Sequence, residues 1–524
     1  MYLMYCNILL IIYINNIYMV KIKNGIKNGI KNGIKNGIKN GIRYEKNGWI
    51  YLSTKGTAKE RGYANGFLMA PELKEIFKML DFNFMYGSGH SRQFFSEVIS
   101  GLYGPQIKEN YPEYYEEMEH IALGAKANGT NVSLDDIIMW NCYVSIDYLM
   151  GSISTLLPTN EKLYKKYGDL FPAGAGSSGS SAEGGRGAKD HCTAFMAVGS
   201  YTKDGKIVCG HNSFDNFIDG QYCNVMLDIN PKKGNRILMQ TAPGWISSGT
   251  DYYVTSGGII CSETTIGGFN KFRLKDPICC RIRKAMQYGN TLDECLNYIK
   301  HNNGGDYANS WLIGDTKTNT IMRIELGLDY MNVEKKKDGY FIGFNATDDP
   351  RIRNLECNNT GYNDVRRHQG ARKVRLTQLM EEHKGKIDVK IGEEILADHY
   401  DVYLNKVNPC SRTCCSHYEL DERAFMSQAD RPLPYQPRGA LDGIVCDTSM
   451  AKKMSLMARW GSSCGIPFEK TKYCNQHIQW NDQEPYLHDR LQQPWTEFTV
   501  LNNRSGTRRI RPRTKINNTK SKKT

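Results

Sequence analysis

The chain has 524 residues, of which 40% are hydrophobic and 23% are charged, so it can bury one large core or two ordinary ones. This composition excludes wholesale disorder, a collagen-like fibre and a polytopic membrane protein. The formal net charge is +13, but the excess of Lys and Arg is concentrated near the two ends of the chain. The positive net charge is therefore poor evidence for a nucleic-acid partner, and none is expected.

The first 46 residues combine an apolar run with a low-complexity spacer. Residues 2–20 carry no charge and would nearly span a bilayer as a helix, so a signal peptide, a signal anchor and a spurious extension all stay open. From Ile22 the tetrapeptide Ile-Lys-Asn-Gly repeats five times, which predicts a flexible segment because Gly at every fourth position opposes a helix. Residues 504–524 carry nine basic residues and no acidic one, which predicts a disordered tail, either solvated or at an anionic membrane surface.

Cysteine content and glycosylation acceptors bear on the compartment. Sixteen cysteines are many for a reducing compartment, and a secretory or membrane-associated location is slightly favoured over a cytoplasmic one. Asn-x-Ser/Thr acceptors, which also fit a secreted protein, include Asn128, Asn131, Asn345 and Asn358.

Metal and cofactor sites are not expected. Cys410, Cys414 and Cys415 lack a paired CxxC spacing, which favours a structural disulfide over zinc. Three histidines that are scattered along the sequence without metal-ligand spacing are interpreted as surface or packing residues: His399, His417 and His477. Nucleotide-binding and zinc-protease motifs are also missing from the positions where strand and helix would support them.

Residues 47–171 are predicted to form a helical N-terminal part. Apolar residues recur at helical spacing from Leu73 to Leu80, and residues 114–127 are rich in helix formers. Ser133 followed by Asp136 predicts a capping box that opens another helix. Residues 172–191 begin with a run of Gly, Ser and Ala, which predicts an exposed loop open to processing.

From residue 192 the hydrophobic period becomes that of strands. Residues 192–198 and 207–211 predict a hairpin around an Asp-Gly turn. Further strands are predicted at 225–229, 236–241, 252–254, 259–261, 310–313 and 320–324, with helices near 279–288 and after a Thr291/Glu294 capping box. The core, taken as residues 192–503, is therefore expected to be an α+β fold of antiparallel sheets covered by helices.

Cys192 stands at the first position of a predicted strand, directly after the predicted loop. If the His191–Cys192 peptide bond is cut, Cys192 gains an α-amine with a pKa of about 8 beside its thiol. One residue then supplies both the nucleophile and the general base, and no separate catalytic His is needed. Taken alone, a cysteine at the start of a strand also fits a buried small hydrophobic residue.

Several segments resemble the penicillin acyltransferase group of N-terminal-nucleophile hydrolases. In and after the first hairpin they are HCTAFMAVGSYTKDGKIVCGHNSFD (191–215), SSGTDYYVTSGGIICSETTIGG (247–268) and ANSWLIGDTKTNTIMRIELG (308–327). Upstream, ERGYANGFLMAPEL, YPEYYEEMEHIALGAKANG and VSLDDI also resemble that group, and NPCSRTCCSHYELD (408–421) and GALDGIVCDTSMA (439–451) are similar to the related phospholipase B-like proteins. Together the matches span roughly residues 50–500.

The resemblance implies a four-layer αββα sandwich of antiparallel sheets and autocatalytic cleavage before Cys192, which leaves the N-terminal fragment as a partner of the core. It implies a cysteine hydrolase or acyltransferase that cleaves an amide or ester bond of a small-molecule or lipid acyl substrate through an acyl-enzyme. A phospholipase B-like lipid deacylase at a membrane surface is the first alternative. A catalytically inactive binding relative is the second, and it is disfavoured because Cys192 and Asn309 are both present.

The same resemblance suggests roles for individual residues. The side chain of Asn309 and a backbone N–H near His211 and Asn212 are the expected oxyanion donors. His211 is expected to reach Cys192 and orient its amine, or else to have a structural role. Asp215 and Glu263 are weaker candidates for substrate binding. Asp190 and His191 are expected to promote processing, although a His stands where the family often has a Gly before the nucleophile.

Overall fold

The computed structural model describes residues 38–171, 192–358, 361–422 and 434–501. The apolar N-terminal run, most of the repeat, the predicted processing loop and the basic tail lie outside the described residues. Among the described helices, none is both long enough and apolar enough to cross a membrane.

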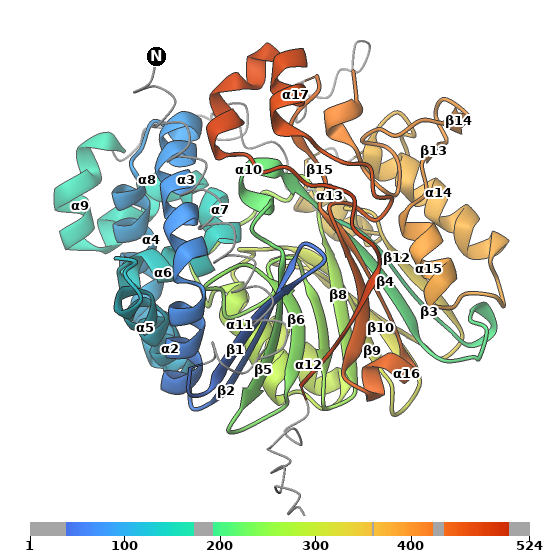
Figure 1. Ribbon diagram of the computed structural model, residues 1–524, viewed down its shortest axis with the longest axis horizontal. Helices are drawn as coiled ribbons and strands as arrows, with labels where there is room; N and C mark the ends of the chain where they lie inside the picture. The colour runs from blue at the N-terminus through green and yellow to red at the C-terminus, as the bar shows by residue number, and fades with distance from the viewer. Residues whose placement is uncertain (1–37, 172–191, 359–360, 423–433, 502–524) are drawn as a thin grey trace, which may run out of the picture.

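Helices dominate the chain before the predicted processing loop, and Figure 1 shows them gathered on one side of the sheets. They are α2 (Ala58–Leu68), α3 (Ala70–Ser88), α4 (Arg92–Asn110), α5 (Pro112–Ala127), α6 (Leu134–Asn141), α7 (Ile146–Gly151), α8 (Ile153–Leu156) and α9 (Glu161–Tyr167). The periodic residues Leu73 and Leu80 are buried on α3, and the Ser133/Asp136 capping box opens α6 as predicted.

A nine-stranded sheet holds most of the predicted hairpins. Its strands, in spatial order, are β1 (Gly41–Lys46), β2 (Trp49–Gly56), β5 (Val225–Pro231), β6 (Ile237–Thr241), β7 (Tyr252–Thr255), β8 (Ile259–Thr265), β9 (Asn309–Asp315), β10 (Thr320–Leu326) and β11 (Met331–Lys336). Neighbours in this sheet are antiparallel except β2 and β5, which run parallel.

A seven-stranded sheet begins at Cys192. Its strands are β12 (Gly339–Gly343), β3 (Cys192–Val198), β4 (Val208–Asn216), β16 (Asp442–Asp447), β17 (Ser455–Trp460) and β18 (Thr496–Thr499), with β15 (Arg438–Ala440) paired to β4. All of these pairings are antiparallel. A two-stranded ribbon, β13 (Tyr400–Asp401) and β14 (Lys406–Val407), lies apart.

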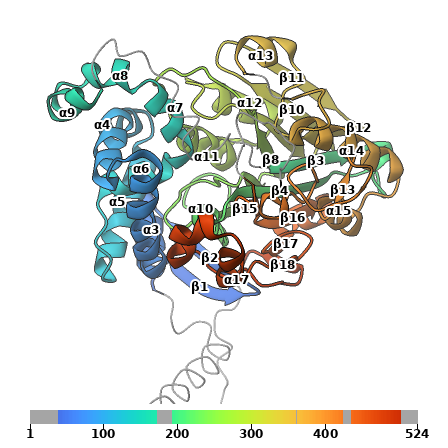
Figure 2. The ribbon, with the colours of Figure 1, turned by 90° about the horizontal axis from the view of Figure 1, so that it is seen from above.

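The two large sheets pack face to face, and helices cover their outer faces. A Cβ placed on Gly314 of β9 would lie 3.2 Å from the sulfur of Met196 on β3. Helices α11 (Ile278–Tyr288) and α12 (Leu292–Lys300) share an apolar cluster with the outer face of the nine-stranded sheet. Helices α14 (His368–Glu382) and α15 (Val389–Leu396) do the same on the seven-stranded sheet (Figure 2). The predicted α+β class with antiparallel sheets is confirmed.

Four short helices complete the fold: α10 (Phe217–Gly220), α13 (Pro350–Leu355), α16 (Thr448–Lys452) and α17 (Lys470–Gln476).

The sequence prediction was wrong at the start of the described chain. Residues 41–46, assigned to the flexible spacer, form β1, which pairs with β2. The part expected to be helical therefore opens with a hairpin, and β2 joins it to the core through β5. At α12, Thr291 caps the helix, but the Glu294 carboxylate accepts a hydrogen bond from the backbone N–H of Asn290 rather than completing a capping box.

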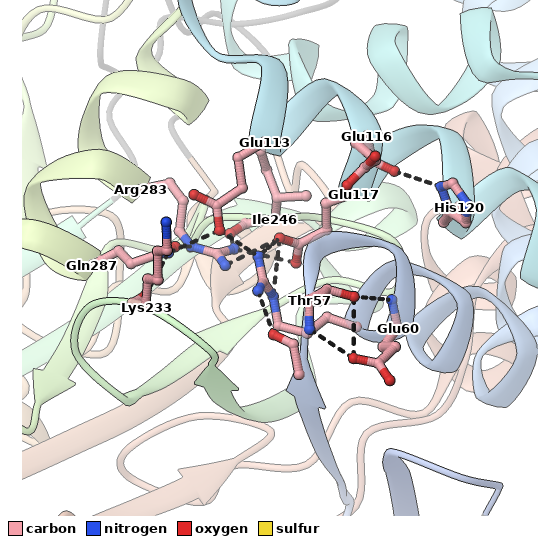
Figure 3. A network of polar contacts seen from close by, with 12 residues as sticks. Thr57, Glu60, Glu113, Glu116, Glu117, His120, Lys233, Ile246, Arg283 and Gln287 are labelled. Atoms are coloured by element: carbon pink, nitrogen blue, oxygen red, sulfur yellow. Dashed lines mark hydrogen bonds and ion pairs between the residues drawn. The ribbon is translucent and has the colours of Figure 1, made fainter.

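A buried ion network joins the helical part to the core (Figure 3). Glu117 of α5 accepts a hydrogen bond from Arg61 of α2 at 2.6 Å and one from Arg283 of α11 at 3.2 Å. All three side chains are buried. Burying three charged groups is tolerated because the carboxylate is shared and the guanidinium groups also donate to backbone carbonyls, for example that of Ile246.

Candidate functional site

Cys192 is the first residue of β3 and its side chain is buried. It lines a cavity of about 80 Å³ between the helical part and the two sheets. Much of the lining is aromatic or apolar and comes from Trp140, Tyr143, Phe214, Trp245, Tyr307 and Leu441. The wall also holds charged side chains, from Asp147, Asp215, Asp219 and Arg438. The cavity therefore offers a thiol to a ligand that has both apolar and polar parts.

The backbone of Cys192 is held by two residues that the sequence analysis did not place in the site. Its N–H donates to Asn345 Oδ1 at 3.5 Å, and its carbonyl accepts a hydrogen bond of 2.5 Å from Arg372 of α14. Arg372 also donates to Asn345 Oδ1 at 2.7 Å. The atom that would become the α-amine after cleavage thus faces a fixed amide oxygen.

Two carboxyl groups lie beside the thiol. Glu263 Oε1 is 3.8 Å from the Cys192 sulfur, and the Tyr307 hydroxyl is 3.2 Å from the same oxygen. Tyr307 also donates to Asp251 at 3.1 Å. Burial, followed by the charge of Asp251, raises the pKa of Glu263 well above its usual range, and burial raises the pKa of Asp251 to about 7. Burial therefore favours the protonated form of Glu263.

The thiol itself is not activated by these surroundings. Burial raises the pKa of Cys192, and the charges of Glu263 and Asp251 raise it further. The guanidinium of Arg372 lowers the pKa but does not offset the other effects. A separate base is therefore needed to take the proton from the sulfur when it attacks.

His211 lies on the same face of the sheet as Cys192 but is not its direct partner. The β3–β4 register pairs Cys192 with Ser213 and Ala194 with His211, because β4 continues to Asn216 instead of ending at His211. Burial lowers the pKa of His211 to about 3, so the ring is neutral. The predicted position opposite Cys192 is wrong by two residues.

The two predicted oxyanion residues are placed differently. Asn212 points to the helix-covered side, where its amide donates to the carbonyls of Leu396 and Cys414 at 2.8 and 3.1 Å. Asn309 is buried at the start of β9, opposite Thr265. Both polar atoms of the Asn309 amide are without a hydrogen-bond partner among the described residues. No hydrogen bond within that part of the chain joins Asn309 to Cys192.

Asp215 lies in the wall of the same cavity, where its carboxylate is 3.4 Å from a guanidinium nitrogen of Arg438. Glu263 contacts Cys192 directly, as described above. Asp190 and His191 lie outside the described residues.

Asn345 had been noted only as a glycosylation acceptor. Its side chain is fully buried, and its amide nitrogen donates to the carbonyl of Thr265 at 2.9 Å. A glycan cannot be attached to this buried side chain in the folded chain. Asn345 instead contacts the backbone of Cys192. A Cys–Asn–Arg arrangement drawn from such distant segments leaves no signal in a single sequence.

The predicted disulfide at Cys410, Cys414 and Cys415 is also not formed, because all three carry free thiols.

Comparison with known proteins gives a consistent family. A sequence model of the family described as Phospholipase B matches residues 111–349, which include Cys192, Glu263 and Asn345. The chain is 27% identical to "Phospholipase B" of Crotalus adamanteus over 277 residues, covering 46% of this chain and 47% of that protein. It is 25% identical to "Phospholipase-B 81" of Drysdalia coronoides over 333 residues, or 57% of each chain.

An uncharacterized protein of Archaeoglobus fulgidus is 24% identical over 282 residues, covering 52% of this chain and 42% of that protein. The chain thus spans about half the length of the curated relatives it matches. The resemblance to the penicillin acyltransferase group stays a prediction. The comparisons therefore show that part of this chain is similar to proteins named phospholipase B.

Proposed function

We propose that this protein is a hydrolase of acyl esters in lipids, of the phospholipase B type, with Cys192 as its nucleophile. The observation that carries the proposal is the position of Cys192, at the first residue of β3 and in the wall of a cavity that has both aromatic and charged side chains. Relatives named phospholipase B support the lipid ester as substrate. The facing sheets with helices on both outer faces are compatible with the fold implied by the resemblance to N-terminal-nucleophile hydrolases.

Maturation is the first step of the proposal. The Cys192 sulfur attacks the carbonyl carbon of His191 and the C–N bond breaks. The thiol proton passes to the departing nitrogen, which becomes an amine, and a thioester joins His191 to the sulfur. Water then hydrolyses the thioester, which restores the thiol and leaves a carboxylate on His191. Asn345 Oδ1, already 3.5 Å from the Cys192 nitrogen, would hold the new amine in place.

Turnover would use the same two groups. The α-amine, with a pKa of about 8, takes the proton from the thiol as the sulfur attacks the ester carbonyl carbon. The amine then gives that proton to the leaving alkoxide. Water attacks the resulting thioester and releases the fatty acid. Because the surroundings raise the pKa of the thiol, the reaction depends on the amine and therefore on prior cleavage.

The test combines intact mass with substrate turnover. The full-length wild type is compared with Cys192→Ala and with Cys209→Ala, a matched loss of a buried thiol on the neighbouring strand. Each protein receives a lysophospholipid and an N-acyl amide of the same acyl chain. We expect the wild type and Cys209→Ala to be cut before residue 192 and to release fatty acid from the lysophospholipid, and Cys192→Ala to do neither.

Three results would redirect the proposal. A folded wild type that stays uncut and inactive would overturn the mechanism and favour the inactive binding relative. Faster release from the amide than from the ester would favour an amidohydrolase or acyltransferase. Activity in a folded Cys192→Ala variant, verified by circular dichroism, would remove Cys192 as the nucleophile.

A further inference from the structure

Four side chains that are scattered in the sequence lie close together, next to Phe214 of β4 and Ala440 of β15. They are His399, Cys415, His417 and Cys464, here called the Cys2His2 cluster, and one ligand atom from each lies within 4.8 Å of the others. His399 precedes β13, Cys415 and His417 follow β14, and Cys464 follows β17. His399 and His417, interpreted from the sequence as surface or packing residues, thus lie next to each other in one cluster, whereas His477 packs against Tyr435 and Tyr473.

The nitrogen–sulfur distances within the cluster are close to those between ligand atoms around one tetrahedrally coordinated ion. His417 Nε2 is 3.3 Å from the sulfur of Cys415 and 3.3 Å from that of Cys464. With zinc–sulfur bonds of about 2.3 Å and zinc–nitrogen bonds of about 2.0 Å, neighbouring ligand atoms are separated by about 3.5 Å. The imidazole rings of His399 and His417 have centroids 5.1 Å apart and are inclined by 66°, so they do not stack.

The groups around the cluster prepare its ligands. His417 Nδ1 is 2.7 Å from Glu419 Oε1, which fixes the proton on Nδ1 and leaves the Nε2 lone pair directed at the two sulfurs. The backbone N–H of Ile466 donates to the Cys464 sulfur at 3.4 Å. That hydrogen bond favours the thiolate form of Cys464. His399 Nε2 is buried without a hydrogen-bond partner among the described residues.

We propose that the Cys2His2 cluster binds one zinc ion. Two thiols lose their protons on binding, so two thiolates and two neutral imidazoles leave the site with no net charge. All four positions are filled by side chains, which is the arrangement of a structural site rather than of a catalytic one with an open position for water. The sulfur and nitrogen donors suit zinc better than magnesium or calcium.

The ion would clamp the loops that support the wall of the Cys192 cavity. Cys415 packs with Phe214 of β4 and Ala440 of β15, with Cys464 against them. Phe214 in turn lines the cavity. His417 also pairs with Gly439 of β15 through an isolated bridge. Metal removal should therefore loosen β15 and the loop after β17. This inference does not depend on the proposed lipid substrate.

The test is metal analysis of the full-length protein purified without chelators. We expect about one zinc per chain, a fall in the melting temperature on adding 1,10-phenanthroline, and recovery on adding zinc. Replacement by Co²⁺ should give the visible d–d bands and the sulfur-to-cobalt charge transfer of a tetrahedral site with two thiolates. Cys464→Ser should lose the charge-transfer intensity of one thiolate. Cys357→Ser, a partly buried cysteine outside the cluster, should leave the spectrum unchanged.

Two results would overturn the proposal. One is a protein that neither retains zinc nor takes up zinc or cobalt after reduction. The other is a native Cys415–Cys464 disulfide in peptide mapping, because oxidised sulfurs cannot bind the ion. If Cys464→Ser does not fold, the zinc content and cobalt spectrum of the wild type still decide the question. Activity towards lipids is not needed for either measurement.

Discussion

At the scale of single residues, the charge of the candidate site is set by two buried carboxyl groups next to a thiol. Glu263 is 3.8 Å from the Cys192 sulfur, and Tyr307 connects Glu263 to Asp251. Both carboxyl groups are buried, and burial disfavours a second negative charge beside the first. The pair therefore keeps a proton to higher pH than a carboxyl group in water would. A protonated Glu263 leaves the sulfur facing a neutral group rather than a second negative charge.

The raised pKa of Asp251 predicts a loss of stability as the pH increases. The pKa is about 7 in the folded protein and about 3.9 in the unfolded chain. Stability from the protonated form is therefore complete below pH 4 and is lost as the pH rises to about 7. Asp251→Asn stays neutral, so the difference in unfolding free energy between variant and wild type should shift in favour of the variant by about 2–4 kcal/mol between pH 4 and pH 8.

Urea unfolding at several pH values measures this difference. Asp293→Asn is the control, because Asp293 is exposed and pairs with Lys335 on the surface. Its difference from the wild type should not change with pH by more than a few tenths of a kcal/mol. A flat profile for Asp251→Asn would mean that Asp251 is ionised in the folded protein.

Predictions for single residues could be made where the signal is local. Cys192 could be singled out because it opens a strand right after a Gly/Ser-rich segment. Asn345 and Arg372 could not, because they lie 153 and 180 residues from Cys192 in sequence and only the fold brings them together. The cysteines and histidines of the Cys2His2 cluster were missed for the same reason, since Cys464 and His417 are 47 residues apart.

At the scale of elements, strands joined by short turns were predicted almost residue by residue, as β3 shows. Their ends were less certain, because polar residues such as Asn212 and Ser213 are buried in β4 and interrupt the apolar pattern that a strand usually shows. The strand was predicted to end at His211 but continues to Asn216. His211 therefore pairs with Ala194 rather than with Cys192. The β1–β2 hairpin was missed because β1 is short, partly exposed and continuous with the repeat.

The buried carboxylate that connects three helices predicts a large mutational effect. Glu117→Gln keeps the shape of the side chain but removes the charge shared by Arg61 and Arg283. Arg61 would keep its ion pair with Glu113, but the buried guanidinium of Arg283 would lose the carboxylate that it contacts. The unfolding free energy should therefore fall by about 3–5 kcal/mol. Urea unfolding at neutral pH measures the loss.

The neighbouring position gives the control. Glu116 pairs with Lys59 on the exposed side of α5 at 3.4 Å, and Glu116→Gln should cost less than about 1 kcal/mol. Equal losses for the two variants would show that the burial of the network contributes nothing to stability.

At the scale of the whole molecule, the segment before the predicted cleavage site is built into the core. Its strand β2 runs parallel to β5 along residues 50–56, and Trp140 of α6 donates to the carbonyl of Pro243 at 2.8 Å. Near the other end of the described chain, the Leu501 N–H donates to the hydroxyl of Tyr51 on β2. Separating the two parts would expose a sheet edge and an apolar helix surface to water.

We therefore expect the two polypeptides to stay associated after cleavage. Cut protein should elute from a sizing column as one peak containing both chains and should separate only in denaturant. A Cys192→Ala variant with a protease site placed in residues 172–191 makes the measurement independent of self-processing. Two peaks from the protease-treated variant in native buffer would contradict this expectation.

The burial of Asn345 matters for any host that glycosylates its secreted proteins. Oligosaccharide transfer acts on Asn-x-Ser/Thr while the chain is still unfolded, and residues 345–347 present such a sequence. A sugar attached there could not enter the space now filled by Cys192, Arg372 and Thr265. Chains modified at this residue would be committed to quality control and degradation. The yield of folded protein from such a host thus depends on whether Asn345 is buried by folding before the transferase modifies it.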